Sequence, residues 1–153
     1  MKKLSPAGIE FIKDCEGFRA SPYLCDAGVP TIGYGTTYYP NGKKVTLRDK
    51  AITEKEGLDI LLFQVNTKYV SVVNNYIRSV EKQLTDNQFD ALVSFAYNLG
   101  NGALQKSTLL KLVLADPKNP AIAEEFPKWI YADGKKSKGL LIRRLNEVKM
   151  YFS

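Results

Sequence analysis

The sequence has 153 residues, of which 44% are hydrophobic and 25% charged, proportions typical of one globular domain with a buried core. It contains no histidine, which excludes Ser–His and Cys–His nucleophilic catalysis in their usual forms, together with histidine-rich zinc sites. The formal net charge of +6 favours anionic partners, and no apolar run approaches the length of a transmembrane helix. Cys15 and Cys25 are too few for a disulfide framework and are expected to be free thiols.

The first predicted element is a short helix that ends at Glu16. Ser5 and Pro6 have the pattern of an N-cap followed by proline at the first helical position, and apolar residues at helical spacing follow. Gly17 is the residue best able to adopt the left-handed conformation that closes a helix. At this end the helix dipole is negative and the neighbours are largely apolar. Both effects are expected to raise the pKa of the Glu16 carboxyl towards the value that a general acid needs.

A small β region is predicted next, from about Phe18 to Val45, where Gly, Pro, Tyr and Thr are frequent. Asn41 and Gly42 lie between the extended segments 36–40 and 43–46, and this dipeptide is a strong hairpin turn signal. The sequence therefore predicts a hairpin with its turn at Asn41–Gly42.

Helical patterns dominate from residue 53 onward. Thr53 and Thr85 each begin a capping-box pattern, and apolar residues at helical spacing follow both. The helix that begins after Thr85 is expected to run to Leu99, where Gly100 and Gly102 end it. The predicted helices cover residues 53–79, 85–99, 107–115, 120–131 and 138–152.

The last predicted helix, 138–152, is both basic and amphipathic. A helix of this kind can lie on an anionic membrane. In a compact domain its apolar side more often closes the core, and that is the expectation here.

Three residues with fixed spacing give the strongest indication of function. Glu16 is followed after eight residues by Cys25, and after five more by Thr31, which begins the run Thr-Ile-Gly-Tyr-Gly. This pattern resembles the Glu-Asp/Cys-Thr triad of phage lysozymes, the T4-type muramidases of glycoside hydrolase family 24. The resemblance extends over nearly the whole chain, through the segments Gln88–Gly100, Ser107–Leu110, Trp129, Gly139–Leu140 and Arg143–Arg144.

The resemblance implies an α+β, lysozyme-like fold in a single domain, 1–153. A small N-terminal β lobe, about 17–50, would be joined by a long helix, about 53–79, to a larger helical lobe, about 85–153. The family places the substrate cleft between the two lobes.

The resemblance also implies residue roles. Glu16, Cys25 and Thr31 would be catalytic, with Thr31 helping to hold the attacking water. In many relatives a histidine follows the second glycine of the motif, whereas this chain has Thr36. The expected substrate contacts are Gly33, Tyr34, Gly35, Tyr97, Asn98 and Thr108.

The second catalytic position carries a thiol where most family members carry aspartate. A thiol with a pKa near 8.5 must first ionise to act as a base, and the neighbouring acids Glu16 and Asp26 are expected to resist that ionisation. Asp26 could supply the carboxylate instead of Cys25. The choice between an inverting and another mechanism stays open at this point.

By resemblance, the chain is an endolysin that hydrolyses the β-1,4 bond between N-acetylmuramic acid and N-acetylglucosamine in peptidoglycan for host cell lysis, without metal or organic cofactor. Two other functions are compatible with the residues. A lytic transglycosylase needs only one catalytic acid and forms 1,6-anhydro products. A non-catalytic wall-binding module would retain the fold without the activity.

The expected partner is the glycan strand of peptidoglycan, bound by a monomer. Nucleic acid is not expected, because the basic residues are dispersed and form no known nucleic-acid motif. Gly8 and Glu10 interrupt any apolar core of a signal peptide. Synthesis in the host cytoplasm is therefore expected, with action on the wall or periplasm after a separate holin has permeabilised the membrane.

Overall fold

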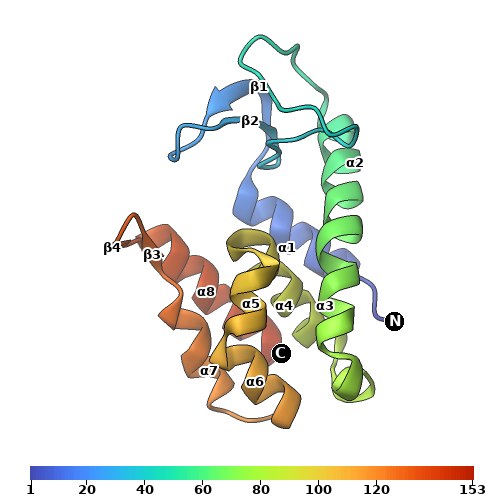
Figure 1. Ribbon diagram of the computed structural model, residues 1–153, viewed down its shortest axis with the longest axis vertical. Coiled ribbons are helices and arrows are strands. Elements are labelled where there is room, and N and C mark those ends of the chain that lie inside the picture. Colours follow the sequence, from blue (N-terminus) through green and yellow to red (C-terminus); the bar gives the residue numbers. More distant parts are fainter. The chain divides into compact units, whose positions relative to one another are not determined.

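The structure, a computed structural model, describes residues 1–153, which form two units (Figure 1). We call residues 9–67 the hairpin unit and residues 1–8 together with 68–153 the helical unit. The fold is α+β and lysozyme-like, with many helices and two small antiparallel sheets. None of the helices combines the length and the apolar character needed to cross a membrane.

Helix α1 (Pro6–Glu16) has the predicted bounds. The Ser5 hydroxyl accepts a hydrogen bond from the Gly8 N–H at 3.1 Å, as an N-cap does. At the other end Gly17 has φ of +69° and donates to the Lys13 carbonyl at 2.8 Å. The predicted helix end at Glu16 is therefore confirmed, together with the left-handed glycine that follows it.

Strands β1 (Arg19–Leu24) and β2 (Pro30–Gly33) form the antiparallel hairpin of the hairpin unit. Tyr23 pairs with Thr31 and Arg19 pairs with Gly33, with a register shift between the two pairs. This hairpin, drawn in blue in Figure 1, comes directly after α1 in the chain.

The predicted turn at Asn41–Gly42 is present, but its flanks do not form strands. Gly42 has φ of +87°, and Tyr39 donates to the Lys43 carbonyl at 2.9 Å. Only an isolated bridge between Tyr38 and Lys44 extends the pairing. Beyond it, the Thr46 N–H donates to the Asp49 carboxylate, at 2.9 Å, and so contributes nothing to a ladder.

The predicted helix 53–79 is divided into segments. Helix α2 (Glu54–Gln64) begins with the predicted capping box at Thr53, a π-helical segment (Val65–Val70) follows, and α3 (Ser71–Tyr76) continues the helical residues. A 3₁₀ helix (Arg78–Gln83) follows α3. The Thr67 hydroxyl donates to the Phe63 carbonyl at 2.7 Å. In this way it competes with the backbone N–H that would bond to the same carbonyl in an α-helix, at the point where the wider π-helical turn occurs.

Helix α4 (Asp86–Leu99) is the centre of the helical unit and has the predicted bounds, with a capping box at Thr85. It packs against α3, α5 and α8. Phe89, Leu92 and Phe95 are fully buried, and the Phe95 ring meets that of Trp129 edge-on at 5.5 Å. The remaining helices of this unit are α5 (Asn101–Lys106), α6 (Thr108–Ala115), α7 (Ile122–Glu125) and α8 (Lys138–Tyr151).

Two predictions for this unit are wrong. Gly102 does not end a helix, because it lies inside α5, which the sequence pattern did not indicate. The predicted helix 120–131 is limited to α7 and a 3₁₀ helix (Phe126–Lys128). The chain then forms a hairpin of β3 (Tyr131–Ala132) and β4 (Lys135–Lys136), whose turn residues Asp133 and Gly134 have φ of +51° and +75°.

Helix α8 has the predicted position, but its burial differs from the expectation. Arg144 and Glu147 are fully buried, whereas Ile142 is 60% exposed and Leu145 is 50% exposed. The expectation that the apolar side of this helix closes the core is therefore wrong for Ile142 and Leu145.

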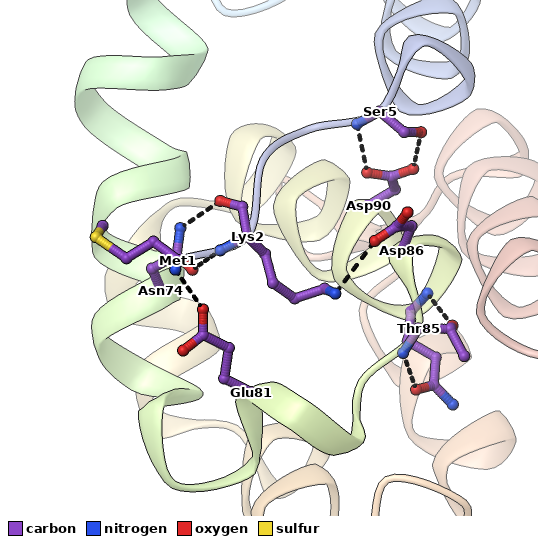
Figure 2. A network of polar contacts seen from close by, with 9 residues as sticks. Met1, Lys2, Ser5, Asn74, Glu81, Thr85, Asp86 and Asp90 are labelled. Atoms are coloured by element: carbon purple, nitrogen blue, oxygen red, sulfur yellow. Dashed lines mark hydrogen bonds and ion pairs between the residues drawn. The ribbon is translucent and has the colours of Figure 1, made fainter.

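The first residues of the chain are bound to the rest of the helical unit through the polar contacts drawn in Figure 2. The Lys2 backbone exchanges two hydrogen bonds with the Asn74 side chain, at 2.9 and 2.8 Å. The Ser5 N–H donates to the Asp90 carboxylate at 3.1 Å, and the Ser5 hydroxyl donates to its second oxygen. Burial raises the pKa of Asp90. These contacts fix the N-cap of α1 onto α4.

Candidate functional site

Glu16 lies at the last position of α1, and its carboxylate packs against Gly35. A Cβ built on Gly35 would lie 2.9 Å from Glu16 Oε1 and 3.5 Å from its Cδ. Gly35 also has φ of +74°, a conformation that favours glycine. The structure therefore brings the Thr-Ile-Gly-Tyr-Gly segment to the Glu16 carboxylate, and Gly35 provides the space for it.

Cys25 lies in a tight turn directly after β1. Its N–H donates to the Val29 carbonyl at 3.1 Å, and its carbonyl accepts from the Gly28 N–H at 2.8 Å. Thr31, which is buried on β2, donates its hydroxyl proton to the same Val29 carbonyl at 2.8 Å. The turn thus brings Cys25 and Thr31 together around the backbone of Val29.

This turn also changes the acidity of the thiol. Hydrogen bonding from the backbone of Val29 lowers the pKa of Cys25, and the backbone of Ala27 and the Thr31 hydroxyl act in the same direction. Burial and the charge of Asp26 oppose this effect without reversing it. The expectation that neighbouring acids keep the thiol from ionising is therefore wrong in its net direction. Asp26 acts as expected, but the hydrogen bonds outweigh it.

Tyr23 belongs to the same region, although it was not among the expected site residues. It pairs directly with Thr31 across the hairpin, and the Arg19 guanidinium lies 3.9 Å from the centre of its ring. Burial raises the pKa of Tyr23, and the charges of Glu16 and Cys25 also raise it. Strand alternation could have indicated this residue, because Tyr23 and Cys25 are two positions apart and share one face.

Gly33 and Tyr34 make internal contacts in the hairpin unit. A Cβ on Gly33 would lie 3.2 Å from Ile52 Cδ1 and 3.6 Å from the Cα of Gly57. Tyr34 is 2% exposed, and its hydroxyl donates to Glu54 at 2.8 Å. Both residues therefore support the segment that carries Gly35.

Thr36 completes the turn that holds Gly35. Its backbone exchanges two hydrogen bonds with Ile32, both at 2.9 Å. Its side chain is buried, and its hydroxyl has no hydrogen-bond partner in the structure. Such a hydroxyl is a cost to folding, because it has lost water without gaining a partner.

The expected contacts Tyr97, Asn98 and Thr108 lie in the helical unit. The Tyr97 ring meets the Tyr69 ring edge-on at 5.2 Å. The Asn98 amide oxygen accepts a hydrogen bond from Arg144 at 2.8 Å. Thr108 is exposed at the first position of α6, whose N-cap is the buried Ser107.

Asn98 is the outer end of a buried ion network that the sequence did not indicate. Arg144 Nε lies 2.6 Å from Glu147 Oε1, and the Ser94 hydroxyl donates to Glu147 Oε2 at 2.6 Å. Arg143 Nε lies 3.6 Å from the same carboxylate oxygen. Burial raises the pKa of Glu147, and the two guanidinium groups oppose this effect. We use the name buried ion network for Ser94, Asn98, Arg143, Arg144 and Glu147.

A separate hollow of about 370 Å³ lies in the hairpin unit. Tyr34 forms part of it, whereas Glu16, Cys25 and Thr31 do not. No group of three or more His, Cys, Asp or Glu side chains is placed to hold a metal ion. The hollow is lined by Glu10, Lys13, Asp14, Gly17, Phe18, Tyr34 and Glu54.

The family model described as phage lysozyme matches residues 13–147, which include the complete Glu16–Cys25–Thr31 motif. The chain belongs to the phage lysozyme family. This family assignment agrees with the fold.

Individual phage lysozymes and endolysins resemble the chain over almost its entire length. It is 40% identical to the endolysin of Bacillus phage PZA, over 99% of this chain and 55% of that protein. It is 34% identical to the endolysin of Salmonella phage P22, and the match covers 100% of both. A solved structure of the endolysin from Escherichia coli O157:H7 phage FAHEc1 has a TM-score of 0.89 and 38% identity, covering 99% of this chain and 94% of that one. The chain spans about half the length of the Bacillus phage relatives that it matches.

Proposed function

We propose that this chain is a lysozyme that hydrolyses the β-1,4 bond between N-acetylmuramic acid and N-acetylglucosamine in peptidoglycan. The observation that carries the proposal is the packing of the Glu16 carboxylate against Gly35. The turn between β1 and β2 holds Cys25 and Thr31 in the same unit. The match of the phage lysozyme family to this motif supports the same activity.

In this proposal Glu16 is the general acid. It gives its proton to the glycosidic oxygen as the bond from that oxygen to the muramic acid C1 breaks. Gly35 contributes by its lack of a side chain, which leaves space beside the carboxylate for a sugar. Glu16 lies at the last position of α1.

Cys25 and Thr31 serve the attacking water. The water oxygen forms a bond to C1, and its proton passes to the Cys25 thiolate, so that the reaction is hydrolysis and no cofactor is required. The hydrogen bonds that lower the pKa of Cys25 favour the thiolate, which is the form that this role requires. The Thr31 hydroxyl donates to the Val29 carbonyl, so its oxygen can still accept a hydrogen bond from the water and orient it.

Sugar contacts are assigned to Gly35, Tyr97, Asn98 and Thr108. The Asn98 oxygen is engaged by Arg144, so the amide presents its N–H donors to a sugar hydroxyl or acetamido oxygen. Gly33 and Tyr34 act from within the hairpin unit, through the contacts that hold Gly35 in place.

The biological role that follows is that of an endolysin acting on glycan strands during host lysis. We propose that it acts as a monomer and that a separate holin gives it access to the wall. The family includes endolysins from several phages, which supports this role.

A turbidity assay on purified peptidoglycan, with mass spectrometry of the released fragments, tests the proposal. We expect clearing of the suspension and fragments that end in reducing N-acetylmuramic acid. Fragments ending in 1,6-anhydro sugars would identify a transglycosylase, an outcome made relevant by the thiol at the position where a second carboxylate is usual. Binding to peptidoglycan without any clearing would identify a wall-binding module.

A further inference from the structure

Helix α8 has three of its charged side chains buried and part of its apolar side chains exposed. Arg143, Arg144 and Glu147 face the core, where they form the buried ion network. Ile142 and Leu145 are 60% and 50% exposed. A helix that only covers a core has the opposite arrangement, with its apolar stripe inside. The exposed side of α8 therefore needs an explanation of its own.

Four exposed residues of α8, together with the exposed Phe152 that follows the helix, form one stripe. Their spacing alternates between four and three residues, which places them on one side of the helix. Two lysines of the stripe are also exposed, so basic and apolar side chains share it. We call this set the α8 stripe, and its members are Lys138, Ile142, Leu145, Lys149 and Phe152.

The short hairpin before α8 adds further side chains of the same kinds. Tyr131 is 57% exposed, and Lys135 and Lys136 on β4 are exposed. The acidic residue of this hairpin is Asp133, at its turn. The carboxylate on α8 itself, Glu147, is buried and paired with arginines, so it does not offset the lysines at the surface.

We propose that the α8 stripe is a docking surface for a bilayer that contains anionic lipids. Lysines near such a surface attract it, each by roughly fivefold in affinity, and their long stems let the ammonium groups reach the headgroups while neighbouring apolar residues enter the interface. Ile142, Leu145 and Phe152 are the side chains that enter.

Charge and apolar character together select this partner over two others. A second copy of the chain would place lysines of one stripe against lysines of the other, and this repulsion opposes a dimer. A purely polar polyanion would pair with the lysines but would leave Ile142 and Leu145 in water. A bilayer with anionic headgroups satisfies both kinds of side chain. The surface is separate from Glu16, Cys25 and Thr31, so the inference does not depend on the proposed catalysis.

Co-sedimentation of the full chain with vesicles tests this surface. Vesicles of phosphatidylcholine with phosphatidylglycerol are compared with vesicles of phosphatidylcholine alone, at low and at high salt. The test variant is Ile142→Ser with Leu145→Ser. The control variant is Leu47→Ser with Phe63→Ser, which removes two apolar residues of the hairpin unit that are 53% and 46% exposed.

We expect at least tenfold stronger binding to the anionic vesicles, reduced at least tenfold in the test variant and within twofold of the original in the control. Lys138→Gln with Lys149→Gln should weaken binding and its dependence on salt. The melting temperature of the test variant should stay within a few degrees of the original, which shows that it folds. Equal binding to both kinds of vesicle, full binding by the test variant, or a dimer in sedimentation equilibrium that the test variant abolishes would overturn the proposal.

Discussion

The molecule has two clusters of polar side chains that are built in different ways. Glu16, Cys25 and Thr31 lie at the end of a helix, in a turn and on a short strand, and Glu16 and Cys25 are half-buried. The buried ion network lies on two long helices, with Arg144 and Glu147 at 0% exposure. The first cluster can reach a ligand, whereas the second is largely closed to it.

This difference predicts that the two clusters have separate energetic roles. Half-buried groups on turns can exchange protons and bind substrates at a small cost to folding. Buried charges that pair with one another affect stability mainly because removing one of them leaves the others buried and unpaired. Substitutions in the first cluster should therefore change activity, and those in the second should change stability.

The largest effect on activity is expected for Glu16→Gln. The amide has nearly the shape of the carboxyl but cannot donate the proton, so clearing of peptidoglycan should fall by about 10³-fold. The melting temperature should change little. Glu10→Gln on the same helix is the matched control and should keep its activity, because Glu10 pairs with Lys13 at the surface. Turnover by Glu16→Gln close to that of the original chain would refute the role of Glu16.

The largest effect on stability is expected for Glu147→Gln. It leaves two buried guanidinium groups without a carboxylate, a change that typically costs about 3–5 kcal/mol. The melting temperature should then fall by about 10 °C, measured by circular dichroism. Glu124→Gln, at an exposed position, is the control and should melt within a degree or two of the original chain. Unchanged stability of Glu147→Gln would mean that the network contributes little to folding.

Cys25 tests which residue is the partner of Glu16. Cys25→Ala should lower the rate by about 10²-fold, because the base that receives the proton is lost. Cys25→Asp should retain activity, and Asp26→Asn should be mild, because the hydrogen bonds of Val29 and Thr31 act on Cys25. A fully active Cys25→Ala together with an inactive Asp26→Asn would transfer the role to Asp26.

Local signals allowed much of this fold to be predicted from the sequence. The ends of α1 and α4 depend on Ser5, Gly17 and Thr85, which act on backbone groups within a turn of themselves. The Asp133–Gly134 turn carried an equally local signal. The helix predicted over 120–131 overlaps the first strand of this hairpin at Tyr131, and this overlap hides the turn signal.

Contacts between distant residues could not be predicted in the same way. The approach of Gly35 to Glu16 and the bond from Arg144 to Asn98 depend on how whole elements pack. The pattern of α8 showed that it was basic and amphipathic, but a partner carboxylate at Glu147 allowed the arginines to occupy the inner side. The motif spacing supplied the candidate residues Glu16 and Cys25, whereas the lowered pKa of Cys25 came from backbone groups that spacing cannot reveal.

The lowered pKa of Cys25 gives a smaller, titratable effect. In a Cys15→Ser background, the rate of alkylation by iodoacetamide should rise with pH around a midpoint below the ordinary value for a thiol. The urea-denatured chain supplies the reference midpoint. Thr31→Val should move the native midpoint upward, because its hydroxyl helps to lower the pKa.

The sign of the effect on folding follows from the same shift. A thiol with a lower pKa in the folded state adds stability that is fully present above the unfolded pKa and is lost as the pH falls through the folded pKa. Clearing of peptidoglycan needs the proton of Glu16 as well as the Cys25 thiolate, so the alkylation rate, and not the rate of clearing, measures this midpoint. A native midpoint at or above that of the denatured chain would contradict the hydrogen-bonded turn at Val29.

The smallest effect compares two threonines of the hairpin unit that differ in their hydroxyl contacts. The Thr31 hydroxyl donates to the Val29 carbonyl, whereas the buried Thr36 hydroxyl has no partner. Thr36→Val removes a group that lost its water without compensation, so the free energy of unfolding should rise by about 1 kcal/mol. Thr31→Val makes the same change in shape but breaks a hydrogen bond, and it should lower that free energy by about 1 kcal/mol. Urea unfolding of both variants measures the difference. Equal changes in the two variants would mean that the Thr36 hydroxyl is bonded in solution, for example to an ordered water beside Gly35.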